Sequence, residues 1–159
     1  MHLVRPLPLD ARPLPAGVGV RPLVAADLDE VACLYFDAYA AGVAAETLEE
    51  ARTEMADVLA GAFGTPIPAA TLVAEEGGRI EGCIQTVLDP PWDAPDGPFV
   101  IELFVAPGRR GRGLGEGLLE AAASALWELG YASVGLNCEP ATAMAAFRIY
   151  QRLGFRALG

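Results

Sequence analysis

The residues best suited to chemistry are the glycines and arginines between positions 108 and 115. This run holds four glycines and three arginines, and it separates a strand-like segment, 99–107, from a helix-like segment, 116–130. Glycine lets the backbone turn tightly, and the amides of such a turn at a helix N-terminus converge on an anion. Arginine adds forked donors that match phosphate oxygens. The run therefore predicts a phosphate-binding loop.

The residues after this run exclude two common kinds of phosphate site. A P-loop ends in Gly-Lys-Ser/Thr, whereas this loop ends in Leu114-Gly115-Glu116 and the chain has no lysine. The dinucleotide pattern Gly-x-Gly-x-x-Gly fails because Glu116 occupies its last glycine position. Spacing alone leaves a structural alternative open, in which an arginine-rich turn merely precedes a glycine-capped helix.

Periodicity along the chain predicts the elements that position this loop. The expected order is β-α-α-β-β-β-α-β-α-β, which is an α/β (α+β) fold with a mixed central sheet flanked by helices. Gly77-Gly78 is typical of a hairpin turn, because both central residues need a positive φ. The expected strands are 18–22, 71–76, 79–89, 99–107, 131–140 and 155–158, and the expected helices are 28–41, 46–60, 116–130 and 141–154.

Two local patterns refine this outline. Asp27, with Glu30 three residues later, predicts a capping box at the start of the first helix. Alternation along the strand at 99–105 predicts its two faces. One face would carry Phe99, Ile101, Leu103 and Val105, and the other Val100, Glu102 and Phe104.

Composition is typical of one folded domain. The chain has 159 residues, of which 53% are hydrophobic, so it can bury a substantial core. We expect a single domain over 17–159, preceded by a proline-rich arm, 1–16, that is extended or disordered. No segment has the roughly 18 to 20 uninterrupted apolar residues of a membrane span. Three widely spaced cysteines form neither a disulfide framework nor a zinc ligand set, so we expect a cytoplasmic protein without a metal site.

Negative charge is concentrated in the first part of the chain. Residues 1–98 hold five arginines and sixteen acidic residues, whereas 99–159 hold six and five, within a total net charge of −10. This excess argues against nucleic-acid binding, which needs a dominant basic field. Acidic residues gather in 40–57 and, beside Trp92, in 89–98, where they could attract a cationic amine. Solvated helix faces would produce the same pattern.

Three motifs, in this order and covering 18–158, resemble the GNAT superfamily of acyl-CoA N-acyltransferases. The first is Val18–Pro22 followed by Asp27, and the second is Arg110-x-x-Gly113-x-Gly115 after Val105-Ala-Pro. The third is the closing pattern Ala146-x-x-Ile149-Tyr150-x-x-Leu153-Gly154-Phe155. Two departures are Ala143, where the family often has asparagine, and an ending at Gly159 that is shorter than usual.

The resemblance implies how acetyl-CoA would bind as acyl donor. Backbone groups of Leu103, Phe104 and Val105 would meet its acetyl and pantetheine parts, on a strand that splays from its neighbour. The pyrophosphate would be held by the amides of the loop, with two arginines nearby. The residues concerned are Arg110, Gly111, Arg112, Gly113, Leu114, Gly115 and Glu116.

Acyl transfer to an amine needs a proton acceptor, an oxyanion donor and a proton donor. The resemblance implies that Tyr150 is the acid and that the Val105 amide is the oxyanion donor. Glu102 is the first candidate base, because partial burial on the same strand would raise its pKa. An ion pair or an exposed sheet edge would give Glu102 a structural role instead. Glu139 and a water-mediated route are the alternatives.

The resulting hypothesis is an N-acetyltransferase that acts by direct transfer in a ternary complex. Its acceptor would be a primary amine, on a cationic small molecule or on a protein. A non-catalytic acyl-CoA-binding or regulatory module is the alternative. Because the last strand is short, an exposed edge there could pair with a second copy of the chain as a homodimer.

Overall fold

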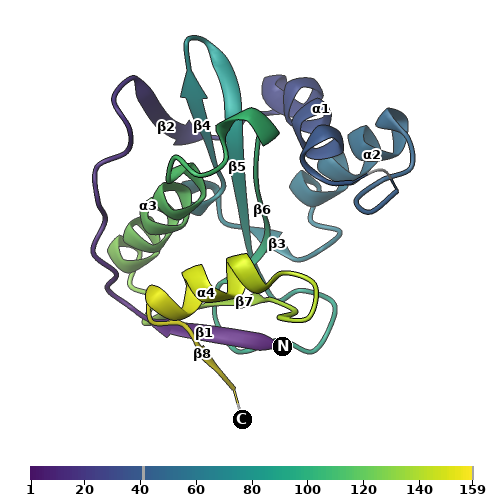
Figure 1. Cartoon of the computed structure of the whole chain (residues 1–159). Helices are drawn as coiled ribbons and strands as arrows, with labels where there is room; N and C mark the ends of the chain where they lie inside the picture. Colours follow the sequence, from purple (N-terminus) through teal and green to yellow (C-terminus); the bar gives the residue numbers. More distant parts are fainter. Residues whose placement is uncertain (41, 159) are drawn as a thin grey trace.

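The computed structural model describes residues 1–40 and 42–158, which form one mixed sheet of eight strands (Figure 1). Seven strands follow the order β2-β4-β5-β6-β7-β1-β8, and β3 pairs with β5 beside this path. Only the β6–β7 pair is parallel within the described sheet. The strands are β1 (His2–Pro6), β2 (Val18–Pro22), β3 (Thr65–Pro66), β4 (Leu72–Glu76), β5 (Arg79–Leu88), β6 (Phe99–Val105), β7 (Ser133–Asn137) and β8 (Arg156–Ala157).

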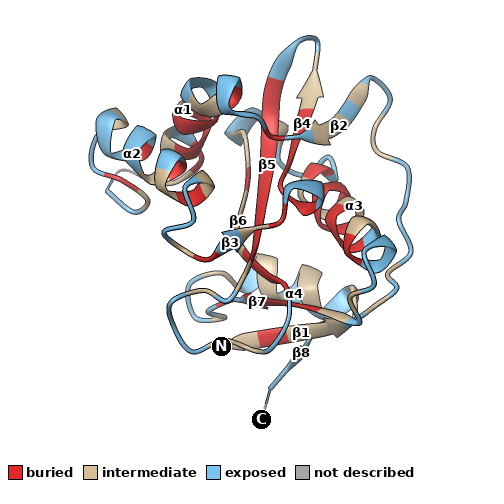
Figure 2. Ribbon diagram, turned by 180° about the vertical axis from the view of Figure 1, so that it is seen from behind, coloured by how far each residue is buried: buried red, intermediate tan, exposed pale blue. Residues whose placement is uncertain are grey.

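Helices cover both faces of the sheet (Figure 1). Helices α1 and α2 pack on one face and α3 and α4 on the other, and each pair closes its own apolar cluster. Strand β5 lies between the two clusters and is buried from Ile80 to Val87 (Figure 2). The helices are α1 (Leu28–Ala38), α2 (Leu48–Leu59), α3 (Leu114–Glu128) and α4 (Met144–Arg152). The predicted fold class is confirmed, with β1 and β3 added to the expected order.

The N-terminal residues differ from expectation. Instead of an arm outside the domain, residues 2–6 form β1, which pairs along its whole length with β7 and also with β8. Leu3 is buried at 1% exposure and belongs to the cluster under α3 and α4. The following segment, 7–17, runs alongside α3 to reach β2 (Figure 1), and we call it the strap.

The C-terminal strand is short, as expected, and forms the sheet edge beyond β1. Strand β8 has two residues, both exposed. Pairing of this edge with a second copy of the chain stays a prediction. Gly159, where the chain ends, lies outside the described residues.

Of the two local predictions for turns and caps, one is confirmed and one is wrong. The Gly77-Gly78 turn is confirmed, with φ values of 61° and 78° between β4 and β5. The capping box at Asp27 is wrong, because that carboxylate accepts hydrogen bonds from Arg21 and from the Val24 N–H and leaves α1 without a side-chain cap. Glu30 instead accepts a hydrogen bond from the Ile80 N–H at 2.8 Å. That helix ends at Ala38, earlier than the predicted residue 41, because Tyr39 is extended; residue 41 itself lies outside the described residues.

Within the described ranges, none of the helices combines the length and the apolar character that a membrane crossing requires.

Replacement of Leu3 by alanine tests whether the N-terminus is part of the core. We expect Leu3→Ala to lower the free energy of unfolding by about 2–5 kcal/mol, because it leaves a cavity beside β7. Leu158→Ala, at a leucine that is 56% exposed near the other end of the chain, should change it by less than about 0.5 kcal/mol. Urea denaturation measures both, and superimposable curves for Leu3→Ala and wild type would contradict this placement.

Candidate functional site

Strands β6 and β7 separate soon after they meet. They are paired only at Phe99–Gly135 and Val100–Leu136, so the last five residues of β6 have no partner on that side. The Ala106 N–H donates to the Glu81 carbonyl at 2.8 Å, toward β5. Because successive N–H groups of a strand point in opposite directions, the Val105 and Leu103 amides face the gap. The divergence therefore presents free backbone groups to whatever occupies this space.

A β-bulge at Ile101 changes the predicted faces of β6. Gln85 pairs with Glu102 and Thr86 with Val100, which leaves Ile101 as the extra residue. Ile101 packs with Phe104 against α1 and α2, whereas Val100 belongs to the opposite cluster. The alternation predicted for these two residues is therefore wrong. Glu102 still lies on the α1 side, opposite Leu103, as expected.

The gap between β6 and α4 is a cleft of about 240 Å³, which we call the β6–α4 cleft. It brings together most of the residues that the sequence singled out, from β6, the glycine loop, α3 and α4. Its lining residues are Ala38, Tyr39, Leu103, Phe104, Val105, Arg110, Gly115, Glu116, Leu119, Ala146, Ile149 and Tyr150. A neighbouring cavity shares six of them and adds Arg109, Gly111, Gly113 and Ala145. The cleft therefore leads from the end of β6 to the glycine loop.

The glycine loop forms an open cradle at the start of α3. Gly111 and Gly113 have φ values of 79° and 81°, and a Cβ at either position would meet no atom within 4 Å. The first helical bond runs from the Gly117 N–H to the Gly113 carbonyl at 2.9 Å. The preceding amides, at residues 114–116, are therefore free of helical partners. Such an open turn at a helix N-terminus fits a pyrophosphate.

The loop arginines are already held by other parts of the chain. Arg112 lies 3.4 Å from the Glu76 carboxylate, and Arg109 lies 3.6 Å from those of Glu76 and Glu81. Arg110 donates to the Ala38 carbonyl at the end of α1 and lines the cleft. Arg110 is thus the arginine best placed to meet a ligand inside the cleft, whereas Arg112 lines a separate cavity between the strap and the glycine loop.

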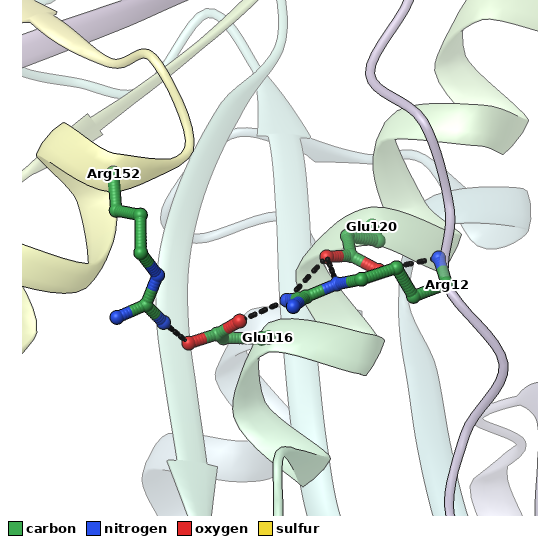
Figure 3. Close-up of polar contacts among 4 residues, drawn as sticks. All are labelled: Arg12, Glu116, Glu120 and Arg152. Carbon is green, nitrogen blue, oxygen red and sulfur yellow. Dashed lines mark hydrogen bonds and ion pairs between the residues drawn. The ribbon is translucent and has the colours of Figure 1, made fainter.

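Glu116 joins three segments at the edge of the cradle. Its carboxylate accepts hydrogen bonds from Arg12 of the strap and from Arg152 of α4 (Figure 3). Glu120, one turn later on α3, accepts from the Arg12 backbone N–H at 2.8 Å and from its guanidinium. This cluster ties α4 and the strap to α3, so the Glu116 side chain has a structural role while its amide faces the cradle.

Tyr150 projects from α4 into the β6–α4 cleft. Its ring packs against Phe155 at a centroid distance of 5.7 Å. Burial raises the pKa of its hydroxyl to about 12, so the proton is retained at neutral pH. A partly buried, protonated hydroxyl beside the unpaired end of β6 can donate to a group that gains negative charge.

Glu102 lies behind the cleft, on the opposite face of β6. Its carboxylate accepts a hydrogen bond from the Tyr39 hydroxyl at 2.9 Å. Burial raises the pKa of Glu102 to about 7, and the Tyr39 hydrogen bond opposes that rise by stabilising the ionised form. At neutral pH this carboxylate can therefore accept or return a proton. Tyr39 lines the β6–α4 cleft, so it connects Glu102 to that space.

A second cavity of about 240 Å³ lies on the Glu102 side of β6, and we call it the carboxylate pocket. It is enclosed by α1, α2, β6 and the loop before β6. Its lining residues are Tyr35, Glu54, Met55, Val58, Phe63, Trp92, Ile101 and Glu102. The Tyr35 hydroxyl donates to the Glu54 carboxylate at 2.6 Å. Glu102 thus lines one cavity and, through Tyr39, borders the other.

Tyr35 and Tyr39 were not among the residues predicted for the site. Tyr35 lies on α1 and Tyr39 directly follows it, with their rings 5.5 Å apart. Their spacing of four is a usable signal, but their carboxylate partners come from α2 and β6. Glu139, the alternative base, is exposed and accepts a hydrogen bond from the Ala141 N–H at 3.3 Å. That contact stabilises the turn before α4.

Comparison with known proteins identifies the family. The family model described as "Acetyltransferase (GNAT) family" matches residues 30–155. The chain belongs to the GNAT acetyltransferase family. Comparison with curated proteins gives no match.

Solved structures agree with the GNAT fold. A GCN5-related N-acetyltransferase from Sphaerobacter thermophilus has a TM-score of 0.72 at 20% identity, with 98% of this chain and 47% of that chain covered. This chain thus spans about half the length of that relative. An aminoglycoside N-acetyltransferase in complex with CoA has a TM-score of 0.69 at 16% identity, covering 92% and 94%. A GNAT acetyltransferase from Brucella melitensis in complex with acetyl-CoA has a TM-score of 0.64 at 25% identity, covering 88% and 83%.

Removal of the Tyr39 hydroxyl from this GNAT protein tests the electrostatics of Glu102. We expect Tyr39→Phe to raise the pKa of Glu102 further above about 7, because the ionised carboxylate loses its hydrogen bond while remaining buried. Carboxyl-carbon NMR of glutamate-labelled protein would follow the titration. Tyr131→Phe, at another partly buried tyrosine, should leave it unchanged. A lower pKa in Tyr39→Phe would contradict this account.

Proposed function

We propose that this protein is an N-acetyltransferase that moves the acetyl group of acetyl-CoA directly to a primary amine in a ternary complex. The acceptor is a cationic amine, on a small molecule or on a protein. The observation that carries this proposal is the pair of cavities on either side of β6, one with the unpaired strand end and Tyr150, the other with Glu102. Two related structures contain CoA or acetyl-CoA, which supports the donor.

The residues present fit acetyl-CoA. The backbone groups of Leu103 and Val105 that face the gap would hold its acetyl and pantetheine parts in the β6–α4 cleft, whereas the backbone of Phe104, also predicted to do so, pairs with Cys83 of β5. The cradle amides from Gly111 through Glu116, including those of Gly113, Leu114 and Gly115, would hold its pyrophosphate, with Arg110 and Arg112 beside them. The open space at Gly111 and Gly113 leaves these amides accessible. When bound, acetyl-CoA supplies an activated thioester carbonyl.

Three groups of the chain would then act on the transfer. The Val105 N–H faces the gap and would stabilise negative charge on the carbonyl oxygen. Glu102 would accept a proton from the incoming ammonium, because its raised pKa matches neutral conditions. As the nitrogen–carbon bond forms and the carbon–sulfur bond breaks, Tyr150, which holds its proton at neutral pH, would donate that proton to the leaving sulfur and recover one from the newly bonded nitrogen. The cleft walls limit the access of water to the reacting groups.

Removal of the Tyr150 hydroxyl tests the acid role. We expect Tyr150→Phe to lower kcat by about 10²- to 10⁴-fold, with the Kd for acetyl-CoA unchanged, because only the proton donor is lost. Release of free thiol measures the rate and calorimetry measures binding. Tyr131→Phe should keep wild-type values of both. Full activity in Tyr150→Phe would show that another group donates the proton.

Two glycine substitutions with matched backbone strain test the cradle. Gly113 and Gly78 have φ values of 81° and 78°, and a Cβ at either meets open space, so valine should destabilise both sites by a similar amount of about 1–3 kcal/mol. Only Gly113→Val should weaken acetyl-CoA binding, by about tenfold or more, because its side chain enters the space in front of the amides. Calorimetry measures the Kd. Equal affinities of the two variants for acetyl-CoA would show that the glycine loop is not part of the binding site.

If the protein binds acetyl-CoA but releases no free thiol from it with any amine tested, the alternative of a non-catalytic acyl-CoA-binding module would be favoured.

A further inference from the structure

We propose that the carboxylate pocket selects a compact primary amine with a single ammonium group on an apolar, aryl- or alkyl-sized body. This inference rests on the proposed transfer reaction, because it assigns the acceptor of the same site. It distinguishes such amines from polycations and from amino sugars, which are equally cationic but polar throughout.

The two carboxylates that line the carboxylate pocket favour a positively charged ligand. Its two carboxylates, Glu54 and Glu102, each receive a tyrosine hydroxyl, and none of the residues lining it is basic. Elsewhere the chain pairs its buried carboxylates with arginine. Asp27 is paired with Arg21, Glu81 with Arg109 and Glu120 with Arg12. Neither Glu54 nor Glu102 is paired with an arginine, so no cation of the chain occupies the pocket, and the pocket favours a cation from outside.

Most of the acidic residues that suggested a cationic acceptor do not reach this pocket. Within the acidic set on and before α2, only Glu54 lines it. Glu50 accepts from the Glu46 N–H, and Glu49 lies 3.6 Å from Arg52 on the exposed side of the helix. From the 89–98 loop, only Trp92 contributes to the lining. The negative surface can steer a cation toward the pocket, but the pocket itself has few charges.

The remaining walls are apolar. Met55 and Val58 come from the buried face of α2, Ile101 from the β6 bulge, and Phe63 from the turn after α2. A second ammonium or a ring of hydroxyls would lose its water against these side chains without gaining partners. An alkyl chain or an aromatic ring would instead bury apolar surface there.

The size of the pocket limits the acceptor. Its volume of about 240 Å³ lies below the roughly 300–1,000 Å³ of cavities that enclose drug-sized ligands. Trp92 is 44% exposed and packs edge-on against Phe99 at 6.2 Å, so it presents a fixed aromatic surface at the solvent side. Glu102 lies on the other face of β6 from the β6–α4 cleft and is joined to it by the hydrogen bond from Tyr39, which lines that cleft. An amine bound with its nitrogen at Glu102 and its body toward Trp92 would therefore have its reactive atom at the end of the pocket that is joined to the cleft.

Three amines test this selectivity with acetyl-CoA in excess. 2-Phenylethylamine has one ammonium and an apolar body, glucosamine has one ammonium and a polar body, and spermidine is a polycation. We expect kcat/KM for 2-phenylethylamine to exceed the other two values by about tenfold or more. Thiol release gives the rate, and mass spectrometry identifies the product. Equal or better turnover of spermidine or glucosamine would overturn the selectivity while leaving the transfer reaction intact.

Matched variants assign the effect to the pocket. Trp92→Ala should raise KM for 2-phenylethylamine about tenfold, whereas Trp127→Ala, at a tryptophan of similar exposure on α3, should not change it. Glu54→Gln should also raise KM, because it removes one carboxylate charge while keeping an acceptor for Tyr35. Glu49→Gln on the same helix should behave as wild type. Unchanged KM in both Trp92→Ala and Glu54→Gln would overturn the proposed location.

A binding measurement separates this inference from the proposed reaction. Calorimetry with CoA-saturated protein should show 2-phenylethylamine binding that Trp92→Ala and Glu54→Gln weaken and that Trp127→Ala does not. If no amine is acetylated but this binding pattern holds, the transfer reaction is wrong and the pocket assignment stands. If 2-phenylethylamine does not bind, or if Trp92→Ala and Glu54→Gln bind it as wild type does, the pocket assignment is wrong.

Discussion

The early separation of β6 from β7 is the constraint on which the rest of the site depends. After Val100 the two strands no longer pair, although β6 continues for five residues along β5. Unpaired backbone groups inside a protein are costly unless a ligand or water satisfies them. Here they face a cleft whose other wall is α4, and they fix where a planar, hydrogen-bonding ligand can lie. The glycine loop follows directly, so the phosphate cradle and the open strand edge form one continuous surface.

Strand β6 borders two cavities, one on each of its faces. The bulge at Ile101 places that side chain on the same side as Glu102 and Phe104, whereas Val100 faces the opposite cluster. Glu102 then lies against Tyr39 on the α1 side, while Leu103 borders the cleft on the other. The Glu102 carboxylate and the unpaired edge of β6 therefore lie on the same strand. The distance between the Glu102 carboxylate and the unpaired edge is therefore set by the geometry of the sheet and not by the conformation of a loop.

Sequence predicted the parts of this arrangement that depend on local backbone chemistry. The glycine loop, the Gly77-Gly78 hairpin and the helix carrying Tyr150 all have short-range signals, and the family motifs set their order. Strand β1 was missed because a single inward residue, Leu3, in a proline-rich stretch gives no clear period. The alternation of residue types along β6 gives no indication of the bulge at Ile101. Tyr39 and Glu54 could not be assigned, because their roles depend on the packing of α1 and α2 beside β6.

The two walls of the β6–α4 cleft are held with unequal strength. Strand β6 is paired along β5 and buried at Phe104, whereas none of the described residues of α4 is fully buried. Helix α4 instead depends on partly buried contacts around Phe147 and Tyr150 and on the ion pair between Arg152 and Glu116. The arginine side chain of that pair is 61% exposed, and such pairs contribute only about 0–1 kcal/mol. The Tyr150 side of the cleft is therefore held by weaker contacts than the strand side, so a displacement of α4 costs less free energy than a displacement of β6.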